Sequence, residues 1–108
     1  MKRGEVWWVE FDPAIGSEIA KRRPAIIVSN DSANRNLSRV VVIPLTSNIA
    51  KVYPGEALVK LGKQTSKAMA DQIMAADKSR LKDQLGTVSR TDMELVEDAM
   101  RVHLGMAK

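Results

Sequence analysis

The residues of this chain that could do chemistry are arginines and short polar side chains next to apolar strands. The basic segment 21–23 leads directly into the apolar run 25–28. That run is bounded by Pro24 and by the polar residues 29–31, as a buried strand with turn signals at its ends would be. Arg23 therefore falls where a loop meets a rigid strand, so its guanidinium can be held in one orientation and aimed at a phosphate. The sequence predicts an anion site at Arg23.

Further short polar groups stand at the ends of the predicted strands, namely Ser17, Glu18, Ser29, Asn30, Thr46, Ser47 and Gln72. In a small barrel, strand ends and their loops gather at one rim. If Arg23 meets Thr46 and Ser47 there, a phosphodiester receives charge stabilisation from the guanidinium and hydrogen bonds from the hydroxyls. RNA supplies its own nucleophile, the 2′-hydroxyl, so an enzyme that cleaves it needs chiefly to position the backbone and stabilise the phosphorane. This pattern favours electrostatic phosphoryl chemistry.

Other catalytic constellations are not indicated. The chain has no cysteine and one histidine, which excludes a thiolate metal site and a zinc site built from histidines. His103 stands near the end of a predicted helix, where a histidine commonly interacts with the last carbonyls. The sequence contains no glycine-rich phosphate loop of the Walker or dinucleotide type. We therefore expect no cofactor and no metal.

Charge is distributed unevenly along the chain. The net charge is +4, but positions 21–67 hold nine lysines and arginines against only Asp31 and Glu56. Positions 89–104 carry more acidic than basic residues. The central segment is thus expected to meet nucleic acid or an acidic polypeptide. Within it, Lys21 and Arg22 are expected to be solvated loop charges.

The elements that must position these residues are predicted to be short strands followed by one helix. Apolar alternation and β-branched runs predict strands at 5–11, 24–29, 40–45, 55–61 and 66–74, with a last short strand at 87–88. Polar segments predict helical turns at 31–36 and 78–81. Pro44 marks an edge or a bulge of its strand. Of the adjacent Trp7 and Trp8, only one can face a given site, because successive strand residues point to opposite faces.

The last element is an amphipathic helix. Ser89 followed by Asp92 resembles a capping box, and Gly105 is a natural C-terminal cap. The apolar face of this helix is predicted to carry Met93, Val96, Met100 and Leu104. The sequence therefore predicts a mainly β (α+β) fold, a strongly bent antiparallel sheet or barrel of five to six strands with a C-terminal helix, in one domain spanning 1–108. We expect no signal peptide and no membrane span, and hence a cytoplasmic protein.

Several motifs taken together resemble a known family over nearly the whole chain. They are Arg3-Gly4-Glu5-Val6-Trp7, Asp12-Pro13, Gly16-Ser17-Glu18, Arg23-Pro24, Asn30-Asp31, Pro44-Leu45-Thr46-Ser47, Gln72-Ile73, Asp77-Lys78, Arg80-Leu81 and Leu104-Gly105. The family is that of the MazF/PemK/Kid-like toxins of bacterial type II toxin–antitoxin modules. Met74 departs from its pattern, because many relatives carry an arginine after the Gln-Ile pair.

This resemblance implies an SH3-like barrel, a homodimer and a sequence-specific, metal-independent endoribonuclease. Such enzymes cut single-stranded RNA to 2′,3′-cyclic phosphate and 5′-hydroxyl ends, inhibit translation and are neutralised by a cognate antitoxin with an acidic tail. The family's catalytic arginine and threonine fall on Arg23 and Thr46. Arg23 would stabilise the phosphorane, and Thr46 would bond a non-bridging oxygen or help a proton move.

The remaining site residues are predicted to bind RNA. Positions that resemble the family's RNA-contacting groups are Ser17, Glu18, Asn30 and Gln72, with Glu18 also a possible general base. Ser47 and Lys51 belong to the polar loop 47–54, where unpaired bases could be contacted.

Two other functions stay open at this point. A gyrase-binding toxin of the CcdB type would share the fold without needing Arg23 and Thr46. A non-catalytic RNA-binding barrel would need only the basic stretch.

Overall fold

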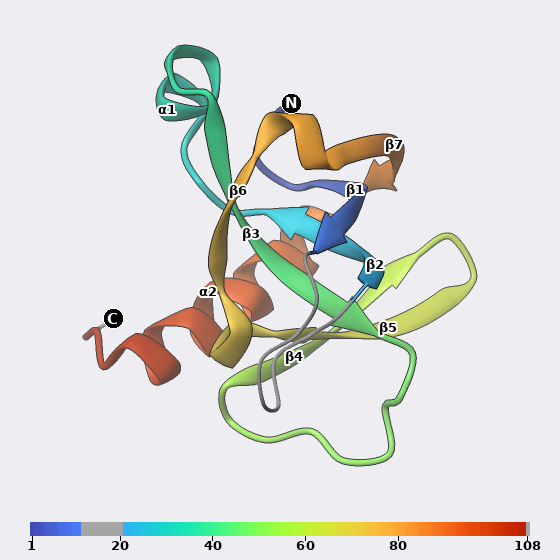
Figure 1. The fold of residues 1–108 in the computed structure, drawn as a ribbon. Coiled ribbons are helices and arrows are strands. Elements are labelled where there is room, and N and C mark those ends of the chain that lie inside the picture. The colour runs from blue at the N-terminus through green and yellow to red at the C-terminus, as the bar shows by residue number, and fades with distance from the viewer. Residues whose placement is uncertain (12–20, 108) are drawn as a thin grey trace.

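The computed structural model describes residues 1–11 and 21–107 and builds them from antiparallel strands and two α-helices (Figure 1). The predicted site residues Ser17 and Glu18 lie outside the described residues. The strands are β1 (Glu5–Phe11), β2 (Lys21–Ile27), β3 (Arg39–Thr46), β4 (Glu56–Leu61), β5 (Gln64–Met69), β6 (Met74–Asp77) and β7 (Leu81–Thr87). The helices are α1 (Asp31–Asn36) and α2 (Arg90–Leu104), with short 3-10 turns η1 (Ala70–Gln72) and η2 (Lys78–Arg80).

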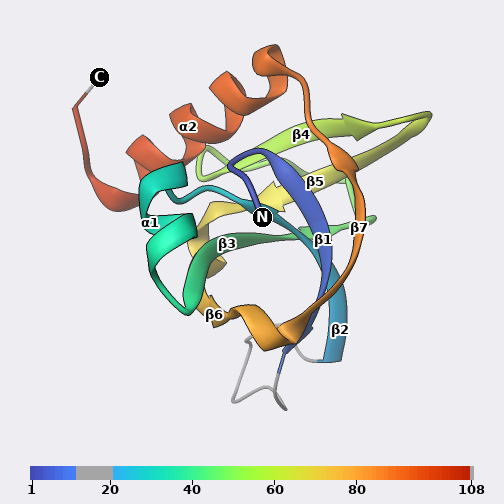
Figure 2. The ribbon, with the colours of Figure 1, turned by 90° about the horizontal axis from the view of Figure 1, so that it is seen from above.

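Strand β3 organises the sheet. The strand order is β4-β5-β3-β2-β1-β7, and β6 pairs with β3 outside this path. Along one side, β3 pairs with β6 as far as Val42 and then with β5 from Leu45 onward. The change of partner bends the sheet around itself, and Figure 2 shows α2 lying alongside β4. The predicted class, an antiparallel sheet with a C-terminal helix, is confirmed.

Pro44 lies where β3 changes partner. It pairs with Ala25 of β2, while its other side falls between the last β6 partner and the first β5 partner. A proline, which has no N–H to give to a ladder, is tolerated at such an interruption. The residue therefore marks an irregularity inside a central strand and not an outer edge of the sheet.

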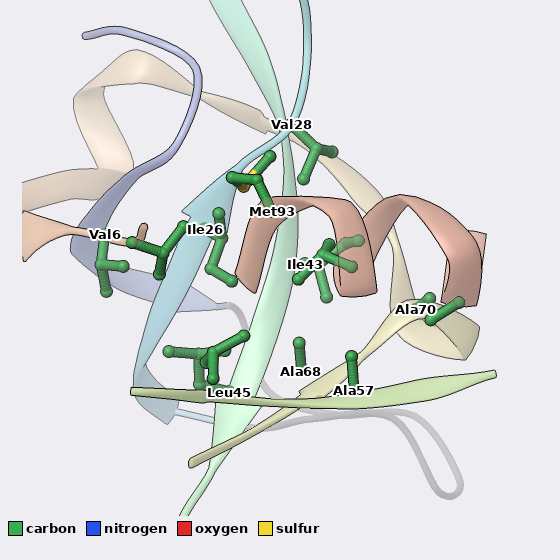
Figure 3. Close-up of a cluster of buried hydrophobic side chains, with 13 residues drawn as sticks. Val6, Ile26, Val28, Ile43, Leu45, Ala57, Ala68, Ala70 and Met93 are labelled. Atoms are coloured by element: carbon green, nitrogen blue, oxygen red, sulfur yellow. The ribbon is translucent and has the colours of Figure 1, made fainter. Parts of the chain in front are cut away.

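The core forms two apolar clusters, one on each face of β2 and β3. Ile26 and Ile43 belong to the cluster under α2, which Figure 3 shows together with Met93 from that helix. Ala25, Ile27 and Val42 belong to the second cluster, on the opposite face. Because both faces of these two strands are buried, their ends are held on a rigid support.

Helix α2 begins and ends as the sequence predicts. The Ser89 hydroxyl accepts from the Asp92 N–H at 3.1 Å, and Gly105 takes the left-handed conformation at φ 69°. The Asp92 carboxylate accepts from the Lys60 N–H at 2.8 Å, which ties the first turn to β4. The predicted apolar face is wrong at Leu104, the last residue of α2, which is 47% exposed, whereas Ala99, which was not predicted, is buried.

The predicted strands differ from the observed strands in four respects. The described residues form seven strands where the sequence indicated five to six. The single strand predicted at 66–74 is broken by η1 into β5 and β6, and the last strand covers Leu81–Thr87 where only 87–88 was predicted. Strand β2 also begins earlier, at Lys21. Within the described part of the chain, no helix is long and apolar enough to cross a membrane.

Candidate active site

Arg23 and Thr46 lie on neighbouring antiparallel strands at the same end of the sheet. Strands β2 and β3 are in register through Ile27 with Val42 and Ala25 with Pro44. Continuing this register by two residues sets Arg23 opposite Thr46. Both are half-buried, and both line one surface pocket of about 260 Å³. The structure therefore brings together the two residues predicted to be catalytic.

We name this pocket the catalytic pocket after these two residues, for which catalysis is a prediction. The other described residues that line it are Trp8, Arg22, Pro24, Leu45, Ser47, Gln64 and Ser66. Two guanidinium groups, three hydroxyls and an amide thus surround it, and none of these described residues is acidic. Such a lining suits an anionic group such as a phosphodiester, because guanidinium donors and hydroxyls bind its oxygens. Among the described residues, no three His, Asp or Glu side chains gather in a way that could hold a metal ion.

Arg22 lines the same pocket and is held by contacts with Trp8 and Asp83. Its guanidinium carbon lies 5.1 Å from the centroid of the Trp8 ring, a cation–π distance, and its Nη2 lies 3.1 Å from Asp83 Oδ2. Arg22 is exposed, but it belongs to β2 and not to a solvated loop as predicted. Strand pairing and stacking on Trp8 therefore give it a defined position.

The tryptophans divide between site and core. Trp8 lines the pocket, whereas Trp7 packs against the second apolar cluster and its indole N–H donates to Glu5 Oε1 at 2.8 Å. This division follows the alternation of strand faces that the sequence predicts.

The loop after Thr46 is held at both ends. At its start, Thr46 Oγ1 accepts from the Asn48 N–H at 3.2 Å, which fixes the oxygen and leaves the hydroxyl proton to be donated elsewhere. At its far end, Glu56 accepts from the Tyr53 N–H at 2.9 Å, and Lys67 Nζ donates to the Lys51 carbonyl at 3.0 Å. Ser47 and Lys51 are both exposed on this loop, but only Ser47 lines the pocket.

Asn30 and Gln72 do not line the catalytic pocket. Asn30 caps α1, its side-chain oxygen accepting from the Ala33 N–H at 2.8 Å. In Figure 1, α1 lies at one end of β3 and the loop after Thr46 at the other. Gln72 is half-buried at the end of η1. Their predicted RNA contacts would therefore lie along the strands, away from the catalytic pocket.

Gln64 and Ser66 are site residues that sequence reasoning missed. They come from β5, which reaches the pocket only because β3 changes partner and pairs with that strand. No local motif marks them. They could have been predicted only if the pairing of β5 with β3 beside Thr46 had been predicted first.

Comparison with known proteins decides the family. A model of the PemK-like, MazF-like toxin of type II toxin–antitoxin systems matches residues 2–104. The chain belongs to this family. Among PemK/MazF-like proteins, endoribonuclease MazF9 of Mycobacterium tuberculosis is 43% identical, with 98% of each chain covered.

Solved structures of the same family share the fold. MazF from Deinococcus radiodurans superposes with a TM-score of 0.85 at 30% identity, covering 98% of this chain and 97% of that one. A mycobacterial endoribonuclease in complex with its cognate antitoxin gives a TM-score of 0.83 at 28% identity, covering 100% and 98%. The family predicted from the motifs is thus confirmed.

Proposed function

We propose that this PemK/MazF-like chain is an endoribonuclease toxin that cleaves single-stranded RNA, inhibits translation and is neutralised by a cognate antitoxin. The observation that carries the proposal is that Arg23 and Thr46 line one pocket, in a chain 43% identical to endoribonuclease MazF9. The site of action is the cytoplasm, where the RNA of translation is found.

In the proposed mechanism, the scissile phosphate occupies the catalytic pocket. The 2′-hydroxyl oxygen attacks the phosphorus while its proton passes to a base, and the bond from phosphorus to the 5′ oxygen breaks as that oxygen takes up a proton. The products are a 2′,3′-cyclic phosphate and a 5′-hydroxyl. Arg23 stabilises the negative charge of the phosphorane, and the Thr46 hydroxyl donates to a non-bridging oxygen. No step in this mechanism requires a metal.

We assign neither the general acid nor the general base to a residue that the structure describes. The described lining of the pocket contains no carboxylate and no histidine. A guanidinium offers several N–H donors and no acceptor for a proton, so Arg23 is assigned an electrostatic role. Glu18 is our candidate base. It is followed closely in sequence by the basic residues 21–23, with which β2 begins.

The remaining predicted residues would supply RNA contacts in addition to those of Arg23 and Thr46. Ser47 lines the pocket itself, and Lys51 is exposed further along the same loop. We assign the other RNA contacts to Ser17, Glu18, Asn30 and Gln72. Positive charge on this face suits a second polyanion as well, the acidic tail of an antitoxin. We also propose that the active form is a homodimer, which light scattering would report as twice 11.9 kDa.

The test is incubation of the purified protein with a long single-stranded RNA in EDTA, followed by mapping of the cut ends. We expect discrete cuts that carry 2′,3′-cyclic phosphate and 5′-hydroxyl ends, and protection when the cognate antitoxin is added first. Intact RNA would exclude the proposal and leave a gyrase-binding toxin or a non-catalytic RNA-binding barrel. Cleavage that stops in EDTA would contradict the metal-free mechanism.

A further inference from the structure

A second pocket, of about 560 Å³, adjoins the catalytic pocket. The two share five lining residues, Trp8, Pro24, Leu45, Gln64 and Ser66. The second pocket is completed by Leu61 and Gly62 from the β4–β5 hairpin and by Leu85, Gly86 and Thr87 from β7. A molecule whose phosphate lies against Arg23 therefore has the second pocket as its immediate neighbour, across a wall that the two pockets share.

The lining of the second pocket differs in chemistry from that of the catalytic pocket. None of its described lining residues is charged. Trp8, Leu61 and Leu85 offer apolar surface, and Gln64, Ser66 and Thr87 offer hydrogen-bond donors and acceptors. This combination suits a neutral, flat group with polar edges. It suits a phosphate or a carboxylate poorly, because no cation is there to offset the loss of hydration.

Two contacts help to shape the walls. A Cβ built on Gly86 would lie 2.8 Å from Leu61 Cδ1, so glycine at this position lets the Leu61 side chain lie against the backbone of β7. On the side of the catalytic pocket, the Arg22 guanidinium stacks on Trp8 at 5.1 Å and restrains the indole. The wall that both pockets share thus includes one aromatic ring, that of Trp8, which Arg22 contacts.

We propose that the second pocket binds the unpaired base of one nucleotide that adjoins the phosphate held by Arg23 and Thr46, with Trp8 as its stacking surface. The inference rests on the proposed function. Stacking of a base on an aromatic side chain accepts any base, and the polar groups Gln64, Ser66 and Thr87 then discriminate among bases through their edges. An acidic antitoxin segment is disfavoured as the occupant because the described lining holds no cation.

The experiment uses an oligoribonucleotide that contains one mapped cut site and a set of variants with a single abasic nucleotide at each position. For the wild type, we expect kcat/KM to fall about tenfold when one base next to the cut is removed, in line with the usual contribution of base–aromatic stacking. Trp8→Ala should lower kcat/KM on the intact RNA about tenfold, and removal of that same base should then cost little more. Trp8→Phe, which keeps an aromatic face, should retain most of the dependence on that base.

A second variant guards against misfolding at Trp8. Leu85 is 40% exposed on β7, so Leu85→Glu places a charge at the pocket without opening the core. We expect it to reduce dependence on the same base while its unfolding transition stays close to that of the wild type. The matched control is Leu95→Glu, on a similarly exposed leucine of α2 (46%) that does not line the pocket, and it should leave the base dependence unchanged.

The outcomes separate this inference from the proposed function. Absence of cleavage by the wild type would refute the function itself. Cleavage in which Trp8→Ala and Leu85→Glu leave every abasic penalty at its wild-type value would overturn the base pocket alone. The abasic penalties of these variants could also stay unchanged while the variants show a lower mass in light scattering or weaker antitoxin binding. That result would assign the second pocket to a protein interface and would also overturn the base pocket.

Discussion

Lys67 Nζ lies 3.3 Å from Glu56 Oε2, and the two side chains are only 11% and 12% exposed. This ion pair closes the segment that follows Thr46, because Glu56 also binds the Tyr53 N–H and Lys67 also binds the Lys51 carbonyl. Lys67 is moreover the residue opposite Thr46 in the β3–β5 ladder. The catalytic threonine that we propose is thus held between a rigid strand and an anchored loop.

Removing one partner of this pair should destabilise the protein. Glu56→Gln leaves the half-buried Lys67 ammonium without a counter-charge. We expect the free energy of unfolding, measured in urea, to fall by about 1–2 kcal/mol, between the usual values for exposed and buried ion pairs. The double variant Glu56→Gln/Lys67→Met removes both charges and should be less destabilised than the sum of the two single variants. Additive losses would show that the two charges do not act as a pair.

Asp31 should contribute to the acid sensitivity of the fold. The Arg3 N–H donates to Asp31 Oδ1 at 2.7 Å, and this hydrogen bond holds the pKa of the carboxyl below its ordinary 3.8. The folded state thus favours the ionised form, so its stabilisation is present above about pH 4 and is lost as the pH falls through the lowered pKa. Asp31→Asn should lose less stability than the wild type between about pH 5 and pH 2. Equal losses in urea titrations at the two pH values would contradict this role.

The N-cap of α2 should be worth about 1 kcal/mol. Ser89→Ala removes the hydroxyl that accepts from the Asp92 N–H. Losing such a cap usually costs about 1 kcal/mol of stability. Thermal or urea unfolding measures the loss. Ser89→Asp keeps an accepting oxygen and adds a favourable charge at a helix N-terminus, so it should retain the stability. A loss in both variants would point to a role other than capping.

Much of the fold follows from local sequence patterns. Alternation in 5–11 and β-branched density in 40–45 predict β1 and β3, and Ser89 with Gly105 predicts both ends of α2. Strand β7 was underestimated because its residues 82–85 are all exposed, so β1 pairing and not burial makes them extended. The break at η1 was missed because alanine and methionine around position 70 suit strand and helix alike.

Part of the candidate site could likewise be predicted from the sequence, and part of it could not. Arg23 and Thr46 could be predicted because each lies next to a recognisable apolar run, 25–28 and 40–45, and β2–β3 pairing then brings them together. Gln64 and Ser66 could not, since their place beside Thr46 depends on the change of partner along β3. The second pocket could not be predicted from the sequence either, because it forms only when β7 lies beside the β4–β5 hairpin.

Arg22 and Arg23 should respond differently to substitution. Arg22 is exposed and paired with Asp83, so its main contribution is attraction to the RNA backbone. Arg22→Ala should raise KM with little change in kcat. The slope of log(kcat/KM) against the logarithm of salt concentration should become shallower by about one. Steady-state cleavage at several salt concentrations measures this. A loss confined to kcat would instead place Arg22 in the chemical step.

The most direct test of the proposed active site is the single-turnover rate of RNA cleavage in EDTA by Arg23→Ala and Thr46→Val. The matched control is Arg39→Ala, at an exposed arginine that begins β3 and does not line the catalytic pocket. Removing a group that stabilises the phosphorane should lower the rate of the chemical step about 100-fold or more for Arg23→Ala, and a smaller loss is expected for Thr46→Val. Arg39→Ala at saturating RNA should stay near the wild-type rate. Cleavage at the wild-type rate by both Arg23→Ala and Thr46→Val would contradict the account and move the catalytic site elsewhere on the molecule.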